Sequence, residues 1–221
     1  MANSHNQRKL NLQDQLVIGF DRIVRSLQSG TTTAKRNSPA EQYHSAARSE
    51  LDDVEKRRVS GLMRVNHTGE VCAQALYQGQ ALTARDPQIK ASMQESAEEE
   101  QDHLAWCEQR LDQLGSRTSR LNPLFYGLSF AVGAFAGAAG DKWSLGFVAA
   151  TEDQVCDHLR EHLEQLPAED EASRAIIEQM LADEAQHGAK ALAHGGVEFA
   201  PPVKKLMTAI SRVMTRTVYH V

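Results

Sequence analysis

Two tetrapeptides decide the fold of this 221-residue chain: EQDH at residues 100–103 and EAQH at residues 184–187. Both read Glu-x-x-His, and a single glutamate precedes each of them, Glu70 thirty positions before the first and Glu152 thirty-two before the second. Residues three apart share a face of an α-helix, so each motif directs a carboxylate and an imidazole the same way. A helix of about thirty residues is roughly 45 Å long, and a returning helix brings residues thirty apart to a similar height. The pattern predicts four antiparallel helices with converging metal ligands.

The two halves of this pattern correspond to each other. Glu152 follows Glu70 by 82 residues, and His187 follows His103 by 84. The near-constant offset indicates a duplicated helical hairpin with a pseudo-two-fold relation. The connection at 115–141 must then cross the bundle instead of turning tightly, which is typical of ferritin-like folds. We therefore predict an all-α, ferritin-like four-helix bundle with a long crossover and extra amphipathic helices.

Proline, glycine and acidic residues mark the expected helix ends. Asp86-Pro87 separates the first two long helices, because the residue before a proline avoids the helical region, and Gly115 ends the second. Asn122 and Asp141 are expected to cap the two helices that follow. The predicted helices cover about 51–85, 87–114, 124–140, 141–167, 170–194 and 201 onward.

The region before the bundle has a different composition. Residues 12–27 carry apolar side chains at steps of three and four, which is typical of an amphipathic helix. Residues 28–40 are rich in Ser, Thr, Asn, Gly and Pro, which is typical of a linker. Two regions are therefore predicted: an amphipathic segment with a linker at 1–47, and the metal-binding bundle with a C-terminal amphipathic helix at 48–221.

Six residues form the candidate metal-ligand set: Glu70, Glu100, His103, Glu152, Glu184 and His187. Four carboxylates and two imidazoles, without a thiolate, suit iron or manganese better than copper, structural zinc or an iron–sulfur cluster. The four carboxylates balance the charge of two ferrous ions, and Glu100 and Glu184 are the candidates for bridging them. One Glu-x-x-His alone is common on solvated helices, so a scaffold whose glutamates bind nothing stays an alternative. The matched repeat, with small apolar neighbours at Glu70 and Glu152, favours the di-metal site because an unpaired buried carboxylate is costly.

Three residues near the motifs have more than one interpretation. Tyr77 lies seven positions beyond Glu70, and it is a core residue, a hydrogen-bond donor behind the ligands, or a redox-active group. His158 lies six positions beyond Glu152, and it is a candidate for supporting the ligands or for handling protons. His67 lies three before Glu70 and either shares its face or lies at the surface.

Charge and cysteine content narrow the class of protein. The net charge is −5, and the sequence divides it into +3 for residues 1–50, −12 for 51–200 and +4 for 201–221. An acidic body argues against a nucleic-acid partner, whose binding domain is normally basic, whereas basic ends suit an anionic membrane surface. The chain has three cysteines, Cys72, Cys107 and Cys156. They are too few and too scattered for a disulfide framework, which indicates a reducing compartment.

Several motifs resemble one known family. The stretch RVNHTGE at 64–70, followed by YQGQ at 77–80, resembles the opening motif of the demethoxyubiquinone hydroxylases, the di-iron monooxygenases of ubiquinone biosynthesis. EQDHL at 100–104 and Asp183-Glu184 followed by His187 fit the family's later motifs. The opening motif is not shared with ferritins or rubrerythrins. The resemblance covers about residues 50–200.

The family's second-half motif is matched with one departure. Glu152 with His158 six residues later fits the motif, but Leu159 stands where some relatives have tyrosine. The role of that tyrosine does not transfer to this chain. The resemblance also does not cover the amphipathic segment at 12–27.

The resemblance implies an activity and a cofactor. It implies that the six ligands hold two iron ions per chain and that O2 is the co-substrate for hydroxylating the ring of a polyprenylated demethoxybenzoquinol. No nucleotide-binding fingerprint is visible, so electrons would come from a partner, from NADH reacting at the quinone, or from the quinol. The alternative is a ferritin- or rubrerythrin-like protein that handles iron or peroxide.

A polyprenyl tail is nearly insoluble, so we expect the protein to meet its substrate at a membrane surface. Residues 121–140 lack a formal charge and carry small residues four apart at Ser129, Gly133 and Gly137. This stretch is weakly hydrophobic and near the minimum span length, which favours a crossover helix that packs on the bundle or touches one leaflet. The helix at 203–216 is a second candidate for membrane contact or for packing. We expect a peripheral protein on the cytoplasmic face of the inner membrane, with ubiquinone-biosynthesis proteins or a second copy as further partners.

Overall fold

The computed structural model describes residues 33–43 and 51–221, and the predicted amphipathic helix at 12–27 lies outside this part of the chain. The described residues form one short 3-10 helix and six α-helices, and no strand is present among them. The prediction of an all-α protein is confirmed. The elements are η1 (Glu41–Tyr43), α2 (Asp53–Thr83), α3 (Pro87–Gln113), α4 (Asn122–Ala139), α5 (Asp141–Gln165), α6 (Glu171–Ala193) and α7 (Pro201–Val218).

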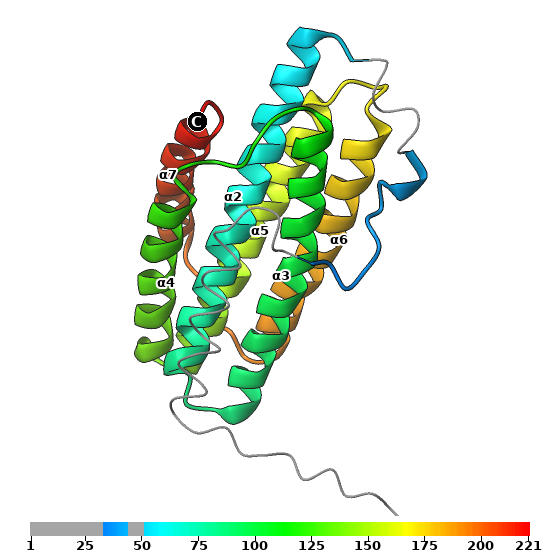
Figure 1. Cartoon of the computed structure of the whole chain (residues 1–221). Coiled ribbons are helices and arrows are strands. Elements are labelled where there is room, and N and C mark those ends of the chain that lie inside the picture. The colour runs from blue at the N-terminus through cyan, green and yellow to red at the C-terminus, as the bar shows by residue number, and fades with distance from the viewer. Residues whose placement is uncertain (1–32, 44–50) are drawn as a thin grey trace, which may run out of the picture.

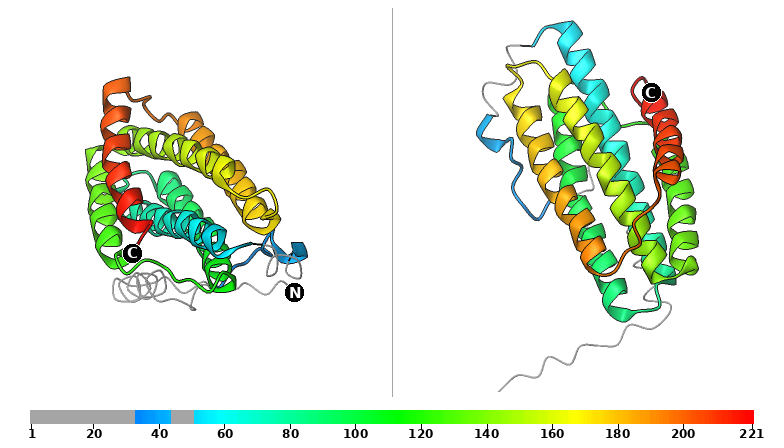
Figure 2. Two further views of the ribbon diagram at one scale, coloured as in Figure 1. Left: turned by 90° about the horizontal axis from the view of Figure 1, so that it is seen from above. Right: turned by 180° about the vertical axis from the view of Figure 1, so that it is seen from behind.

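Four of the helices form the predicted bundle. Helices α2 and α3 make one antiparallel hairpin, and α5 and α6 make the other, packed beside the first (Figures 1 and 2). After α3 the chain passes over the end of the bundle, and α4 runs along the outer side of α2 before α5 begins (Figure 1). This passage is the long crossover that the ferritin-like fold requires. Helix α7 lies on the same side of the molecule as α4 (Figures 1 and 2).

Acidic side chains cap three of the bundle helices. Asp52 accepts hydrogen bonds from the backbone at the start of α2, and Glu55 bonds back to the Asp52 amide to complete a capping box. Asp86 caps α3, and Asp170 caps α6. Such caps satisfy N–H groups that the first helical turn leaves without partners.

Two predicted caps are wrong, for a physical reason. Asn122 and Asp141 lie inside α4 and α5, and their side chains bond to other parts of the bundle instead of to their own helices. Asn122 accepts a hydrogen bond from the Thr68 hydroxyl at 2.7 Å. Asp141 accepts the backbone N–H groups of Arg85 and Asp86 at 3.1 and 3.0 Å. These two residues therefore join neighbouring elements, which local sequence signals do not reveal.

Glycines allow α4 to lie against α2 at close range. A methyl group added at Gly133 would collide with the Leu76 carbonyl, and one added at Gly79 would collide with the Phe130 carbonyl. The small-residue ridge of the crossover thus serves helix packing inside the protein. No helix in the described ranges is long and apolar enough to span a bilayer.

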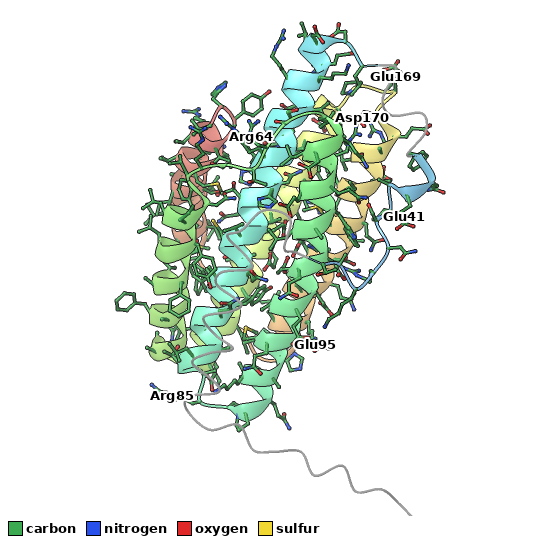
Figure 3. The ribbon with its side chains drawn as sticks, in the orientation of Figure 1. Glu41, Arg64, Arg85, Glu95, Glu169 and Asp170 are labelled. Atoms are coloured by element: carbon green, nitrogen blue, oxygen red, sulfur yellow. The ribbon has the colours of Figure 1, made fainter. Side chains whose placement is uncertain are left out.

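Two arginines join helices near the ends of the bundle. Arg110, which is 1% exposed, donates to Asp170 and Ser173 at 2.8 Å each and so joins α3 to the start of α6. Arg64 of α2 donates to the Tyr219 carbonyl at 2.6 Å and fixes the C-terminal end of α7 (Figure 3). Breaking a buried ion pair is costly because it leaves an uncompensated charge.

Residues 33–43 pack on the bundle, which their linker-like composition does not indicate. The segment that carries Glu41 lies beside α6, away from α4 and α7 (Figures 1 and 3). Ala40 is 1% exposed and belongs to the apolar core that contains Trp106 and Leu111. The division of the chain at residue 47 stays a prediction.

Candidate metal centre

The six predicted ligands come together in the middle of the bundle. Helix α2 supplies Glu70, α3 supplies Glu100 and His103, α5 supplies Glu152, and α6 supplies Glu184 and His187. All six are buried, with exposed fractions of 5% or less. The repeat in the sequence has therefore become a single cluster in space.

Two carboxylates occupy the centre of this cluster. Glu184 places its two oxygens 3.1 Å from the Nδ1 atoms of His103 and His187. Glu100 lies between the same two atoms, at 3.2 and 3.4 Å. Each central carboxylate thus faces one imidazole from each half, which is the placement that bridging ligands need.

The remaining two carboxylates lie at the two sides of the centre. Glu70 approaches His103 Nδ1 at 3.5 Å, and one donor atom from each of Glu70, Glu100, His103 and Glu184 falls within 4.8 Å of the others. Glu152 accepts a hydrogen bond from the Tyr77 hydroxyl at 2.6 Å. Tyr77 is thus placed as a hydrogen-bond donor behind a predicted ligand.

Each histidine is held on its outer side by an acid from the opposite half of the bundle. His103 Nε2 lies 2.9 Å from Asp183 of α6, and His187 Nε2 lies 2.5 Å from Glu99 of α3. Because an ionised carboxylate only accepts, Nε2 carries the proton in each pair. The Nδ1 atom of each ring is then the one that faces the cluster, as in carboxylate–histidine–metal arrangements.

Burial makes the two outer carboxylates of this cluster, Glu70 and Glu152, hard to ionise without cations. Burial raises the pKa of Glu70 well above its ordinary value, and repulsion from Glu100 and Glu184 adds to the shift. Burial likewise raises the pKa of Glu152, and the charges of Glu184 and Glu100 raise it further. Metal ions beside these two carboxylates would favour their ionised forms.

The pKa values of the two histidines are set mainly by the neighbouring acids, which outweigh the effect of burial. Burial lowers the pKa of His103, but hydrogen bonds to Asp183 and Glu100 outweigh burial and raise it well above the ordinary value. Burial also lowers the pKa of His187, but Glu100 and Glu184 raise it to about 12. In the metal-free centre, protons on the imidazoles therefore provide the positive charge, and metal uptake must release them.

The unsatisfied atoms of the cluster test whether metal ions fit. Within the described part of the chain, one buried oxygen of each of the four glutamates has no hydrogen-bond partner: Glu70 Oε2, Glu100 Oε1, Glu152 Oε2 and Glu184 Oε1. Buried polar atoms are normally paired, so four such oxygens beside two imidazoles need an explanation. A hard or borderline cation gives one, because carboxylate oxygen and imidazole nitrogen are its preferred donors. The residues fit a metal centre.

An apolar cavity of about 350 Å³ reaches the cluster at Glu70. Helices α2, α4, α5 and α7 form its wall, and Gly69 and Leu76 line it beside Glu70. His158 also lies on this wall and is half-buried there. The structure thus places His158 at the cavity and Tyr77 at the ligands.

Three residues of this centre were missed by sequence reasoning. Asp183 and Glu99 each stand immediately before the glutamate of a Glu-x-x-His motif, so an acid at this position is itself repeated. That signal was available from the sequence. Arg36 bonds to Asp183 from the N-terminal segment at 2.9 Å, and no spacing rule points to it.

The fold and the cluster together define a ferritin-like helical bundle with a buried carboxylate–histidine site suited to metal ions. The profile of the family described as "Ubiquinone biosynthesis protein COQ7" matches residues 57–218, and the chain belongs to this family. The resemblance seen in the sequence motifs is confirmed.

Curated relatives support the same assignment over nearly the whole chain. The chain is 57% identical over 216 residues to a protein of Stutzerimonas stutzeri named 3-demethoxyubiquinol 3-hydroxylase, covering 98% of this chain and 99% of that protein. It is 58% identical over 215 residues to the protein of that name in Pseudomonas fluorescens, covering 97% and 99%. The protein of that name in Acinetobacter baumannii is 58% identical over 207 residues, covering 94% and 96%.

A solved structure shares the fold at much lower sequence identity. The bacterioferritin-related protein of Bacteroides fragilis, described as a dodecameric thioferritin, superposes with a TM-score of 0.56 at 17% identity. The match covers 78% of this chain and 96% of that chain. It confirms the ferritin-like architecture of the bundle.

Proposed function

We propose that this chain is a 3-demethoxyubiquinol 3-hydroxylase that binds two iron ions between its four central helices. The proposal rests above all on one observation: an apolar cavity ends at Glu70, a predicted ligand of a buried carboxylate–histidine cluster. Family membership and the names of the close relatives support the substrate class. The wall of this cavity suits an apolar molecule.

The protein residues have distinct roles in this proposal. Glu100 and Glu184 would be the ligands that the two ions share, because each faces both histidines. His103 and His187 would bind through Nδ1. Two iron ions, when bound, would offer open coordination positions for reducing dioxygen, and the electrons would come from a partner protein, from NADH or from the quinol. One oxygen atom enters a ring C–H bond and the other leaves as water, which takes two electrons and two protons.

The two outer candidate ligands, Glu70 and Glu152, have different surroundings, which bears on the side from which the quinol reaches the centre. Each of them has one oxygen without a partner among the described residues. Glu152 is fixed by Tyr77 and borders a second, more polar cavity of about 370 Å³, whereas Glu70 borders the apolar cavity. We infer that the quinol ring approaches from the Glu70 side, with its tail in the cavity. The apolar wall excludes water from the ring and leaves the tail in surroundings that suit it.

The mouth of the cavity supports a membrane location. Leu128 and Val132 of α4 and Ile210 of α7 line the cavity and are also 44% to 64% exposed. The same two helices expose Phe135 at 77% and Val213 at 67%. An apolar rim around a lipid-binding cavity suits peripheral contact with one leaflet. We propose contact on the cytoplasmic face of the inner membrane, in line with the absence of a disulfide framework.

Filling the cavity tests the site of substrate binding. A Cβ atom at Gly69 would meet no heavy atom within 4 Å, so Gly69→Leu adds a side chain into open space in the middle of a helix. We expect this variant to keep its iron and to lose at least about tenfold in hydroxylation, because the ring can no longer reach Glu70. Gly69→Ala is the matched control, since it shares the gain in helix stability of about 0.5–1 kcal/mol but leaves the cavity open. Turnover by Gly69→Leu equal to that of Gly69→Ala would rule out this cavity as the substrate-binding site.

The reaction itself is tested in bacterial cells that lack their own 3-demethoxyubiquinol 3-hydroxylase. The demethoxy intermediate should accumulate in these cells and disappear, by mass spectrometry, when this chain is supplied. Restoration by Glu184→Ala would contradict a metal-dependent role. Purified protein that oxidises many irons per chain, or turns over peroxide, while the demethoxy intermediate persists would favour the ferritin-like alternative.

A further inference from the structure

Residues 33–43 lie on the side of the bundle away from α4 and α7 (Figures 1 and 2), and their contacts with α3 and α6 place them behind the metal centre. The central residue of this segment is Arg36, whose side chain enters the seam between α3 and α6. Its Nε donates to Asp102 of α3 at 2.7 Å, and its Nη1 donates to Asp183 of α6 at 2.9 Å. Its Nη2 lies 3.5 Å from His103 Nε2. A single guanidinium therefore reaches both acids and the back of a predicted ligand.

The position of Arg36 is fixed by more than its charge. Its guanidinium lies over the Trp106 ring, 4.8 Å from the centroid, and the Trp106 indole N–H donates to the Arg36 carbonyl at 3.3 Å. The backbone N–H of Lys35 donates to Asp102 at 2.6 Å. Backbone, ring and carboxylate contacts thus hold the side chain in one place.

We propose that Arg36 is a positioning residue of the metal centre, holding Asp183 where Asp183 fixes the orientation of His103. The Asp183 oxygen that accepts from Arg36 also faces His103 Nε2, at 2.9 Å. Without the guanidinium, the negative charges of Asp102 and Asp183 would oppose each other across the seam. Asp183 would then turn toward solvent, and the His103 ring would lose its fixed orientation. The inference rests on the proposed function, because it assumes that His103 binds a metal ion.

Lysine is not an adequate replacement at this position. A guanidinium presents several donors in a rigid planar fork, whereas an ammonium is a compact point charge on a flexible stem. Only the fork can bond Asp102 and Asp183 at once while stacking on Trp106. Arg36→Lys should therefore keep the charge and lose most of the positioning.

Cobalt(II) alone is a suitable probe, because its visible spectrum reports ligand geometry without turnover. We would measure cobalt affinity, the visible band and the rate of cobalt loss to EDTA for four proteins: wild type, Arg36→Met, Arg36→Lys and Lys35→Met. Loss from Arg36→Met should be about tenfold faster, at the lower end of the effect of outer partners of metal ligands, with a shifted band. Arg36→Lys should lie between Arg36→Met and wild type. Lys35→Met, which removes an exposed ion pair with Glu98, should match wild type.

A double variant separates positioning from simple stabilisation of the fold. If Arg36 acts through Asp183, Arg36→Met should add no more than about twofold in the Asp183→Asn background, because coupled residues are not additive. A full tenfold effect there, or a wild-type rate in Arg36→Met, would overturn the inference. Wild-type protein that binds no cobalt would instead overturn the metal centre, and the role of Arg36 with it. A faster rate in Lys35→Met equal to that of Arg36→Met would show that the segment acts only as a cover.

Discussion

The two crossed acid–histidine pairs have the same pattern in the sequence and different surroundings in the fold. Asp183, which holds His103, has a side chain 16% exposed and is also bonded by Arg36 and Gln179. Glu99, which holds His187, has a side chain 44% exposed. The two hairpins therefore supply two similar sets of candidate ligands, but among the described residues an arginine holds the outer acid of only one set. We infer that the protein surroundings, not the repeat, make the two ion positions different.

The largest effect is expected from removing a central carboxylate that faces the histidines of both halves. Glu184→Ala takes away a carboxylate that lies 3.1 Å from each histidine. We expect iron to fall from about two ions per chain to nearly none, and hydroxylation to fall at least about a hundredfold. Metal analysis of the purified protein measures the first effect. Glu178→Ala, an exposed position on the same helix, is the control and should retain both ions.

The second test compares the two outer acids directly. Asp183→Asn should speed metal loss to a chelator about 10- to 100-fold, since a partner that orients a ligating histidine typically has this effect. Glu99→Gln should change the rate less than about threefold, because solvent water replaces an exposed partner. Chelator competition on both variants measures the ratio. Equal rates in the two variants would show that the difference in burial has no consequence for the metal.

The clustering of the six candidate ligands and the positions of the helices could be predicted because both follow helical periodicity. The spacing within each Glu-x-x-His motif and the offset between the halves contain the geometry of the cluster. The crossed acids were also present as a repeat, Glu99 and Asp183, but their pairing with the opposite half depends on how the hairpins dock. Periodicity along one helix does not report that docking.

The part of the centre that could not be predicted depends on contacts between distant residues. Arg36 meets Asp102 and Asp183, which are 66 and 147 positions away in the chain. The composition around Arg36 is typical of a linker, and no repeat marks it. Asn122 and Asp141 failed as caps for a related reason, since tertiary hydrogen bonds took precedence over local ones.

A third test concerns the inner side of the centre, where the halves also differ. Tyr77 bonds to Glu152 at 2.6 Å, and among the described residues the free oxygen of Glu70 has no such donor. Tyr77→Phe should lower the free energy of unfolding of the metal-free protein by about 1–3 kcal/mol, because a buried carboxylate loses its partner. It should keep two ions and lose less than about tenfold in turnover. A hundredfold loss with intact iron would instead indicate a redox role for the phenol.

The smallest expected effect is on the pH dependence of stability, and it comes from a buried histidine whose described partner is an amide. Among the described residues no carboxylate bonds to His162; its Nδ1 donates to the Asn66 side-chain oxygen at 2.7 Å, and burial lowers its pKa to about 4. The unfolded chain binds a proton near pH 6.5, so between about pH 6.5 and 4 the unfolded state holds more protons than the folded state. Stability therefore falls as the pH falls through this window, by about 2 kcal/mol at pH 5 for this one group.

Urea unfolding of the metal-free protein at pH 7.5 and pH 5 measures this loss. His162→Gln should reduce the difference between the two pH values by about 1–2 kcal/mol, whatever its effect on absolute stability. His187 is similarly buried but has acid partners that raise its pKa to about 12, so it should not contribute to a loss in this window. An unchanged pH difference in His162→Gln would mean that folding does not change the pKa of His162. The contrast between acid partners and an amide partner would then not explain why some buried histidines of this bundle are charged and others are neutral.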